Sequence, residues 1–141
     1  MDKTLVAASG NKHDYYSFPA VLVAKTRRPK TVCRTSAKMG QTNPDANSDA
    51  TDKNRLVKMS NDVSTLALAW YFSQDERYAQ KAVQQIKSWF LDANTRMTPN
   101  LQYAQAIPGI NTGRGIGIID SRALVEVVDA IALPAIIQRA E

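Results

Sequence analysis

NDVSTLALAWYFSQDERYAQKAVQQIKSWFLD, residues 61–92, is the stretch that decides the fold of this chain. Its apolar residues recur with the three- and four-residue spacing of helices, in one stripe before residue 73 and another after it. The stripes predict core-facing helices over about residues 54–72 and 75–91, joined as an antiparallel hairpin, with Ser73 and Glu76 at capping-box spacing. Their members are Val63, Leu66, Ala67, Trp70, Tyr71, Tyr78, Ala82, Val83, Ile86, Trp89 and Phe90.

The sequence after this hairpin predicts a long loop and then a third helix. Residues 92–118 contain two prolines and four glycines, and a connection of this length inside a domain usually has a function. Asp120 or Ser121 then suits the cap of a helix over residues 120–139, which Pro134 should kink or end. Because no strand pattern of comparable length is present, the predicted fold class is all-α.

The charge of the chain is concentrated in one segment before the hairpin. The chain carries a net charge of +5 and has a pI of about 9.5, which would ordinarily suggest an anionic partner. Six of its 18 Lys and Arg lie in residues 19–39, which hold no acid, so 12 basic residues face 13 acidic ones elsewhere. The basic character therefore belongs to residues 19–39, while the polar residues 41–54 predict a loop leading into the first helix.

Several classes of site do not fit the composition. A single cysteine, Cys33, and a single histidine, His13, exclude a disulfide framework and a Cys/His zinc site built within the chain. The glycines at 113, 115 and 117 follow no strand pattern and precede no Gly-Lys-Ser/Thr, which argues against a nucleotide loop. No apolar run approaches the roughly 18 residues of a membrane span, and the first residues lack the layout of a signal peptide. We therefore expect no nucleic-acid partner, no membrane insertion and no metal.

Three motifs together carry a resemblance to a known family. They are NKHDYYSF at 11–18, the run at 61–92, and NLQYAQAIPGINTGRGIGIID at 100–120. These motifs resemble the alginate lyase family over nearly all of the chain except residues 19–39. The resemblance implies that residues 1–141 are a partial alginate-lyase domain. Its fold would be part of an (α/α) toroid of helical hairpins, with residues 92–118 as a loop of the central cleft.

The resemblance also implies a function. The family cleaves alginate or related polyuronates by β-elimination, without a nucleotide or organic cofactor, and the intact protein would be periplasmic or secreted. Elimination requires stabilisation of an enolate and groups that move protons. In the family these roles belong to an Asn-Asn-His motif that follows the region covered here and to a later Tyr. This chain has no Asn-Asn-His, so we expect a fragment that is inactive alone, with its catalytic residues unknown.

The alternative function is non-enzymatic. A truncated helical module would at most bind an acidic glycan or a protein partner through its exposed faces. Turnover of a polyuronate, read as the ultraviolet absorbance of the unsaturated product, separates the two hypotheses.

The first and third motifs supply the candidate substrate-binding residues. Lys12, His13 and Tyr15 could pair with uronate carboxylates and stack on a sugar; alternatively, His13 and Asp14 satisfy each other or a loop backbone. Tyr103 and Gln105 could hydrogen-bond sugar hydroxyls, unless Tyr103 simply packs under the loop. Asn111 and Arg114 are the strongest pair, because a guanidinium grips a carboxylate bidentately.

The glycines around Arg114 allow two interpretations. Gly109, Gly113, Gly115 and Gly117 would let the backbone approach a ligand closely. In the alternative, these glycines only make tight turns and Arg114 caps a neighbouring helix.

Residues 19–39 are where the resemblance fails, and a reading-frame slip would explain this. Plausible codons for Val21–Thr26, read one base later, give Tyr-Trp-Trp-Pro-Lys, which is family-like. We therefore expect residues 19–39 to be aberrant and poorly ordered, and resequencing of the DNA tests the idea. A genuine basic arm for nucleic acid or acidic glycan is the alternative, although this segment lacks interleaved aromatic residues.

Overall fold

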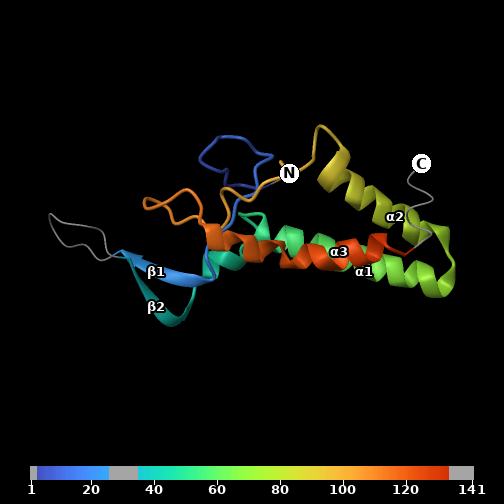
Figure 1. Cartoon of the computed structure of the whole chain (residues 1–141), viewed down its shortest axis with the longest axis horizontal. Coiled ribbons are helices and arrows are strands. Elements are labelled where there is room, and N and C mark those ends of the chain that lie inside the picture. The colour runs from blue at the N-terminus through green and yellow to red at the C-terminus, as the bar shows by residue number, and fades with distance from the viewer. Residues whose placement is uncertain (1–2, 26–34, 134–141) are drawn as a thin grey trace.

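The computed structural model describes residues 3–25 and 35–133 of the chain. Its framework is a hairpin of two helices, α1 (Lys53–Ser73) and α2 (Glu76–Ile86), with a third helix, α3 (Leu124–Ile131), packed along α1 (Figure 1). The helical fold class and the predicted hairpin are thus confirmed. The described helices do not by themselves form a ring, so the toroid stays a prediction.

One stripe of α1 forms the centre of the core. Leu56, Met59, Val63 and Ala67 are at most 3% exposed and follow one another at helical spacing. Tyr71, which the sequence analysis placed in this stripe, is instead 53% exposed, because the buried stripe reaches Trp70 and leaves the next residue at its edge. Partly buried side chains pack against the core from the other elements, among them Val83, Ile86, Trp89, Phe90, Leu101 and Leu124.

The turn between α1 and α2 differs from the predicted capping box. Ser73 is the last residue of α1, and its hydroxyl donates to the Ala69 carbonyl at 2.7 Å. The N-cap of α2 is Asp75, whose carboxylate accepts the backbone N–H of Arg77 at 3.0 Å. The prediction failed because Ser73 and Asp75 are both good capping residues, and the left-handed backbone of Gln74 places Asp75 at the start of the helix.

The third helix begins later than predicted. Residues Gly115–Ala123 form a 3-10 helix, η3, and only then does α3 start, at Leu124. Asp120 lies inside η3 and caps nothing, which corrects the role that the sequence analysis gave it. The end of the predicted helix, with Pro134, lies outside the described residues. Helix α2 is followed directly by one π-helical turn, η2 (Lys87–Leu91).

A small β-hairpin is an addition that the sequence analysis did not predict. Strands β1 (Val21–Lys25) and β2 (Thr35–Thr42) pair antiparallel, with an irregularity between Val21 and Val23, and a 3-10 turn, η1 (Pro44–Asn47), follows. The expectation that residues 19–39 are poorly ordered stays a prediction, and residues 26–34 lie outside the described residues. The two strands satisfy their backbone hydrogen-bonding groups by pairing with each other. The sequence did not predict them because a short strand lacks the long alternation of apolar and polar residues that indicates a strand.

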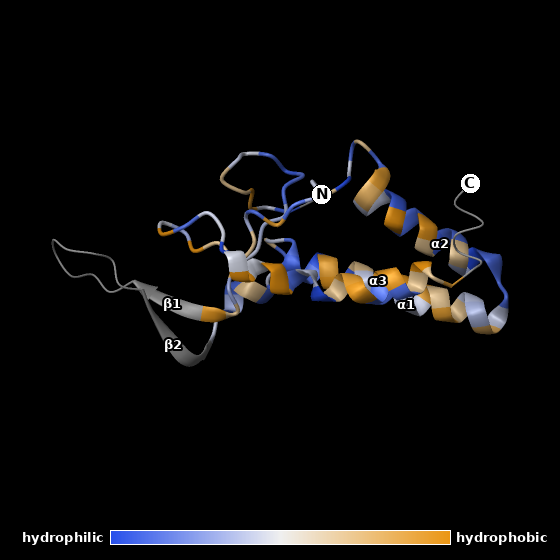
Figure 2. Cartoon of the chain, in the orientation of Figure 1, coloured by the Kyte–Doolittle hydropathy of each residue, from blue (hydrophilic) through white to orange (hydrophobic). Residues whose placement is uncertain are grey.

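Apolar side chains remain on the outer surface of the helices. Figure 2 shows hydrophobic residues along α3, where Val125 and Val128 are each more than 60% exposed. Phe72, near the far end of α1, is 80% exposed. Within residues 3–25 and 35–133, no helix is long and apolar enough to cross a membrane.

Candidate functional site

A buried carboxylate, Asp120, joins the first and third sequence motifs. Its Oδ2 accepts hydrogen bonds from the Ser17 hydroxyl at 2.5 Å and the Tyr15 hydroxyl at 3.1 Å, across more than 100 residues of sequence. Its Oδ1 accepts the Gln105 side-chain N–H at 3.2 Å. Asp120 is 8% exposed and Gln105 is 9% exposed. An ionised carboxylate can only accept hydrogen bonds, and here three neutral groups donate to it. Among the described residues Asp120 forms no ion pair.

Gln105 connects this carboxylate to Arg114. The Arg114 Nη2–H donates to Gln105 Oε1 at 2.7 Å, and its Nε–H donates to the Gln105 backbone carbonyl at 3.1 Å. Gln105 has a left-handed backbone, with φ of 52°, and its own N–H donates to Ser17 Oγ at 2.8 Å. Two of the predicted site residues are thus brought together. Arg114 is only half-buried, so its other N–H groups remain available for a carboxylate.

The first motif is extended, and its side chains alternate between core and surface. Tyr15 and Ser17 are 1% and 0% exposed, whereas Tyr16 and Phe18 are half-exposed and meet edge to face with ring centres 5.3 Å apart. The prediction that Tyr15 stacks on a sugar is therefore wrong, because its ring lies in the core. Tyr16, which was not among the predicted site residues, is the tyrosine of this motif that reaches the surface, as the two-residue period of an extended segment could have indicated.

The third motif contacts the first motif through its backbone. Tyr16 pairs through its backbone with Tyr103 in a parallel bridge, and Ala106 N–H donates to the Ser17 carbonyl at 2.8 Å. Tyr103 is half-buried rather than packed fully under the loop, so part of its ring reaches the surface. The bridge therefore places the backbones of two tyrosines side by side, with Tyr103 two residues before Gln105.

Burial gives Tyr15 a titration that can be tested. Desolvation, with the nearby Asp120 carboxylate adding to it, raises the pKa of Tyr15 well above its ordinary value of 10.0. The folded protein therefore needs the neutral phenol. The stability that Tyr15 contributes is complete below the unfolded pKa of about 10 and is lost as the pH rises above it.

We expect Tyr15→Phe to be less stable than wild type near neutral pH by about 1 kcal/mol, for the lost hydrogen bond to Asp120. Above about pH 10 the wild type should lose up to about 1.4 kcal/mol more per pH unit than the variant. Urea unfolding followed by circular dichroism across this range measures both, and parallel pH profiles would show that the phenol does not titrate as described.

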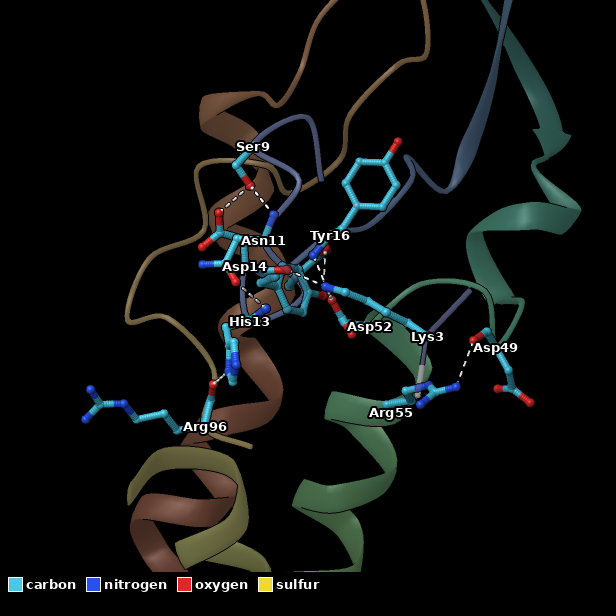
Figure 3. Close-up of polar contacts among 12 residues, drawn as sticks. Lys3, Ser9, Asn11, His13, Asp14, Tyr16, Asp49, Asp52, Arg55 and Arg96 are labelled. Carbon is cyan, nitrogen blue, oxygen red and sulfur yellow. Dashed lines mark hydrogen bonds and ion pairs between the residues drawn. The ribbon is translucent and has the colours of Figure 1, made fainter. Parts of the chain in front are cut away.

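A second buried cluster anchors the beginning of the chain. Lys3 Nζ lies 2.5 Å from Asp52 Oδ2, both side chains are 0% exposed, and Lys3 also donates to the Asp14 carbonyl (Figure 3). The same Asp52 oxygen accepts the Tyr16 N–H at 2.9 Å. Asp52 precedes α1, so the ion pair fixes the first motif against the start of that helix.

His13 and Lys12 lie apart from the Asp120 cluster. His13 Nδ1 lies 2.6 Å from the Arg96 carbonyl, and since a carbonyl only accepts, Nδ1 carries the proton (Figure 3). His13 thus satisfies a loop backbone, as the alternative interpretation held, and lines a hollow of about 820 Å³ with Arg96, Asn100 and apolar residues. Lys12 is exposed. The hydrogen bonds of the described residues do not connect either side chain to Gln105 or Arg114.

Two glycines of the third motif, Gly113 and Gly117, let the loop pack closely on its own chain. A Cβ on Gly113 would lie 1.9 Å from the Gln102 carbonyl oxygen, and one on Gly117 would lie 2.6 Å from the Ala104 Cβ. A Cβ on Gly115, by contrast, would meet nothing within 4 Å. The close approach at Gly113 and Gly117 is thus to residues 102–104, and an approach to a ligand stays a prediction. The Asn111 Oδ1 accepts the Ile107 N–H at 3.0 Å, which closes the turn.

A hollow beside the Asp120 cluster carries charges of both signs. It measures about 470 Å³, within the usual range for ligand sites. Its polar lining consists of Lys53, Asn61, Gln105, Asp120, Arg122 and Glu126. Among the described residues no cluster of three or more His, Cys, Asp or Glu side chains is placed to hold a metal ion. The arrangement therefore offers amide groups and charges of both signs to a polar, hydroxylated ligand.

Comparison with known proteins bears on what such a ligand is. The profile of the family described as alginate lyase matches residues 1–140. A search of curated proteins gives no match. Among solved structures, the crystal structure of an alginate lyase from Bacteroides ovatus at 1.60 Å resolution is similar, with 44% sequence identity and a TM-score of 0.81. The similarity covers 99% of this chain and 36% of that one, so this chain spans about a third of the relative's length.

Proposed function

Because this chain belongs to the alginate lyase family, we propose that it binds alginate or a related polyuronate and serves as the substrate-recognition part of a lyase that acts by β-elimination. The observation that carries the proposal is the Gln105–Arg114 pair, in which a half-buried guanidinium is held by two hydrogen bonds with donors to spare. A polyuronate presents one carboxylate on every sugar. A fixed guanidinium suits that carboxylate better than a flexible ammonium.

Neighbouring groups support a sugar polymer rather than a small anion. The half-exposed Tyr16 and Tyr103, whose backbones pair in a bridge, offer apolar ring faces for a sugar. In the hollow that Gln105 lines, Lys53 and Arg122 bring positive charge beside the carboxylates of Asp120 and Glu126. Amide groups of Asn61, Gln105 and Asn111 suit hydroxyls, which both donate and accept.

We propose that the elimination step itself needs groups that this chain does not supply. Removal of the C5 proton requires a base next to the sugar and donors for the enolate. His13, the one histidine of the chain, does not serve the Gln105–Arg114 pair, since its Nδ1 is bonded to the Arg96 carbonyl in a separate hollow. The chain would then bind its polymer without cleaving it, and the intact enzyme would work in the periplasm or after secretion.

We expect Arg114→Ala to weaken binding of a short alginate oligosaccharide by about tenfold to a hundredfold, since charge-assisted hydrogen bonds contribute about 1.5–3 kcal/mol. Isothermal titration calorimetry on the 141-residue chain measures the affinity. The matched control is Arg77→Ala, an exposed arginine whose Asp75 pair lies at the far turn between α1 and α2, and it should bind like wild type.

Three further measurements decide between the functions. A neutral oligosaccharide of the same length should bind far more weakly, and equal binding would contradict carboxylate recognition. Unsaturated uronate released by this chain and lost in Arg114→Ala would show that it is a complete enzyme. Absence of any glycan binding would favour the alternative, a helical module for a protein partner, for which the exposed apolar residues of α3 are the observation in support.

A further inference from the structure

We propose that Asp120 is a positioning residue, which sets the orientation of the Gln105 amide and through it holds Arg114 ready for a carboxylate. Asp120 is nearly buried, and its two oxygens already accept three hydrogen bonds from the protein, so its role is to position other groups. It nevertheless collects the Tyr15, Ser17 and Gln105 donors at 2.5 to 3.2 Å. The part of this inference that concerns the ligand rests on the proposed function, and the part that concerns Arg114 does not.

The direction of the Gln105 amide follows from its two neighbours. An ionised carboxylate can only accept hydrogen bonds, and a guanidinium can only donate them. Gln105 lies between one of each, with Nε2 at 3.2 Å from Asp120 Oδ1 and Oε1 at 2.7 Å from Arg114 Nη2. A flipped amide would face donor to donor at Arg114 and acceptor to acceptor at Asp120. Only the observed orientation satisfies both ends of the chain of hydrogen bonds.

The backbone reinforces this relay, the chain of hydrogen bonds from Asp120 through Gln105 to Arg114. Gln105 has a left-handed backbone that a side chain rarely adopts, and Ser17 holds it by accepting the Gln105 N–H. Ser17 in turn donates to Asp120. Arg114 is tied to the same segment by its own N–H, which donates to the Ala104 carbonyl at 3.0 Å. Asp120 therefore fixes both the side chain and, through Ser17, the main chain against which the guanidinium rests.

This arrangement lowers the entropy that ligand binding must remove. A free arginine side chain samples many rotamers, and ordering it on binding weakens the affinity. Here the protein itself orders the guanidinium, because two N–H groups of Arg114 are engaged with Gln105. The ligand meets only the remaining donors.

The test uses Asp120→Asn, which keeps the size of the side chain but places a donor where an acceptor stood. If the new amide oxygen serves Tyr15 and Ser17, the new NH₂ faces the Gln105 NH₂ and drives the Gln105 amide to flip. The flipped amide then presents donors to Arg114. We expect the Arg114 Nη–H and Gln105 side-chain NMR resonances to move toward solvent-exposed values, and alginate-oligosaccharide affinity to fall about tenfold.

A second change should restore the relay. In Asp120→Asn with Gln105→Glu, the introduced carboxylate accepts both from the new amide at position 120 and from Arg114, so the Arg114 Nη–H resonances should return to their wild-type positions. The matched control is Asp120→Asn with Gln102→Glu, which adds the same charge on an exposed side chain three residues away and should restore nothing. A role of Asp120 in general stability predicts no difference between the two double variants.

Each outcome bears on one proposal. An unchanged Arg114 resonance in Asp120→Asn, or equal rescue by both second changes, overturns the positioning role. If Asp120→Asn does not fold, Gln105→Met takes its place: it breaks the relay while leaving Tyr15 and Ser17 on Asp120, and an unmoved Arg114 resonance there overturns the proposal. If the wild type binds no oligosaccharide, the proposed function fails, while the resonances still test the positioning of Arg114.

Discussion

Lys3→Met should lower the free energy of unfolding by about 3–5 kcal/mol, because it leaves the buried carboxylate of Asp52 without its cation. The Lys3 Nζ and Asp52 Oδ2 atoms lie 2.5 Å apart, and neither side chain is exposed. Methionine keeps the length and the apolar stem of lysine, so the change isolates the charge. The measurement is urea unfolding monitored by circular dichroism at neutral pH.

The hydrogen bonds of Asp52 explain why loss of the Lys3 ammonium group should lower the stability so strongly. Its Oδ1 has no hydrogen-bond partner among the described residues, so Oδ2 carries the contacts with Lys3 and with the Tyr16 N–H. Lys3 also donates to the Asp14 carbonyl within the first motif. Loss of the ammonium group therefore loosens the segment that positions Tyr16, and oligosaccharide affinity should fall together with stability.

Two comparisons make this prediction specific. Lys58→Met removes a similar ion pair with Asp62 on the surface of α1, where the Lys58 side chain is 75% exposed, and should cost less than about 1 kcal/mol. Lys3→Met combined with Asp52→Asn should regain part of the loss, because the unpaired charge is gone and the amide oxygen still accepts from Tyr16. Equal destabilisation by Lys3→Met and Lys58→Met would show that burial does not control the strength of the pair.

Gly113→Ala should destabilise the chain by about 2 kcal/mol or more, at the upper end of what overpacking costs, and should abolish the effect of Arg114 on oligosaccharide binding. The new Cβ would lie 1.9 Å from the Gln102 carbonyl oxygen and 2.9 Å from the Tyr103 Cα. These are backbone atoms, so the segment carrying Tyr103 and Gln105 must move away. Thermal unfolding and calorimetric titration measure the two effects.

Gly115→Ala is the matched control for this prediction. It lies two residues further along the same glycine run, and a Cβ there meets nothing within 4 Å. We expect its stability to stay within about 0.5 kcal/mol of wild type and its affinity to be unchanged. If both alanine variants behave alike, the glycines act through chain flexibility, and the close packing of the loop on Gln102 is not what matters.

The hairpin of α1 and α2 could be predicted because its signal is local. Val63 and Ala67 are neighbours on one helix face whatever surrounds them, so their spacing indicates the buried side directly. Helix ends were less certain, as Asp75 rather than Ser73 caps α2. The motifs also contain the Gln105–Arg114 pair, whose members are close in sequence, and the family itself was predicted from them and is confirmed.

Contacts between segments far apart in the chain could not be predicted from the sequence. Tyr15 and Asp120 are 105 residues apart, and nothing near either of them indicates the other. Tyr15 was therefore assigned to a ligand and Asp120 to a helix cap, although the fold buries both in one cluster. The pairing of β1 with β2 and the ion pair of Lys3 with Asp52 were missed for the same reason.

The sequence by itself determined the helices, the glycine-rich loop and the family, because helical periodicity and motif spelling depend on neighbours along the chain. Only the tertiary structure decided which polar residues reach the surface and which are buried and hold the others in place. A buried carboxylate and a catalytic or binding carboxylate have the same chemistry and differ only in the donors that surround them. For Asp120 those donors come from two other segments, and folding alone brings them together.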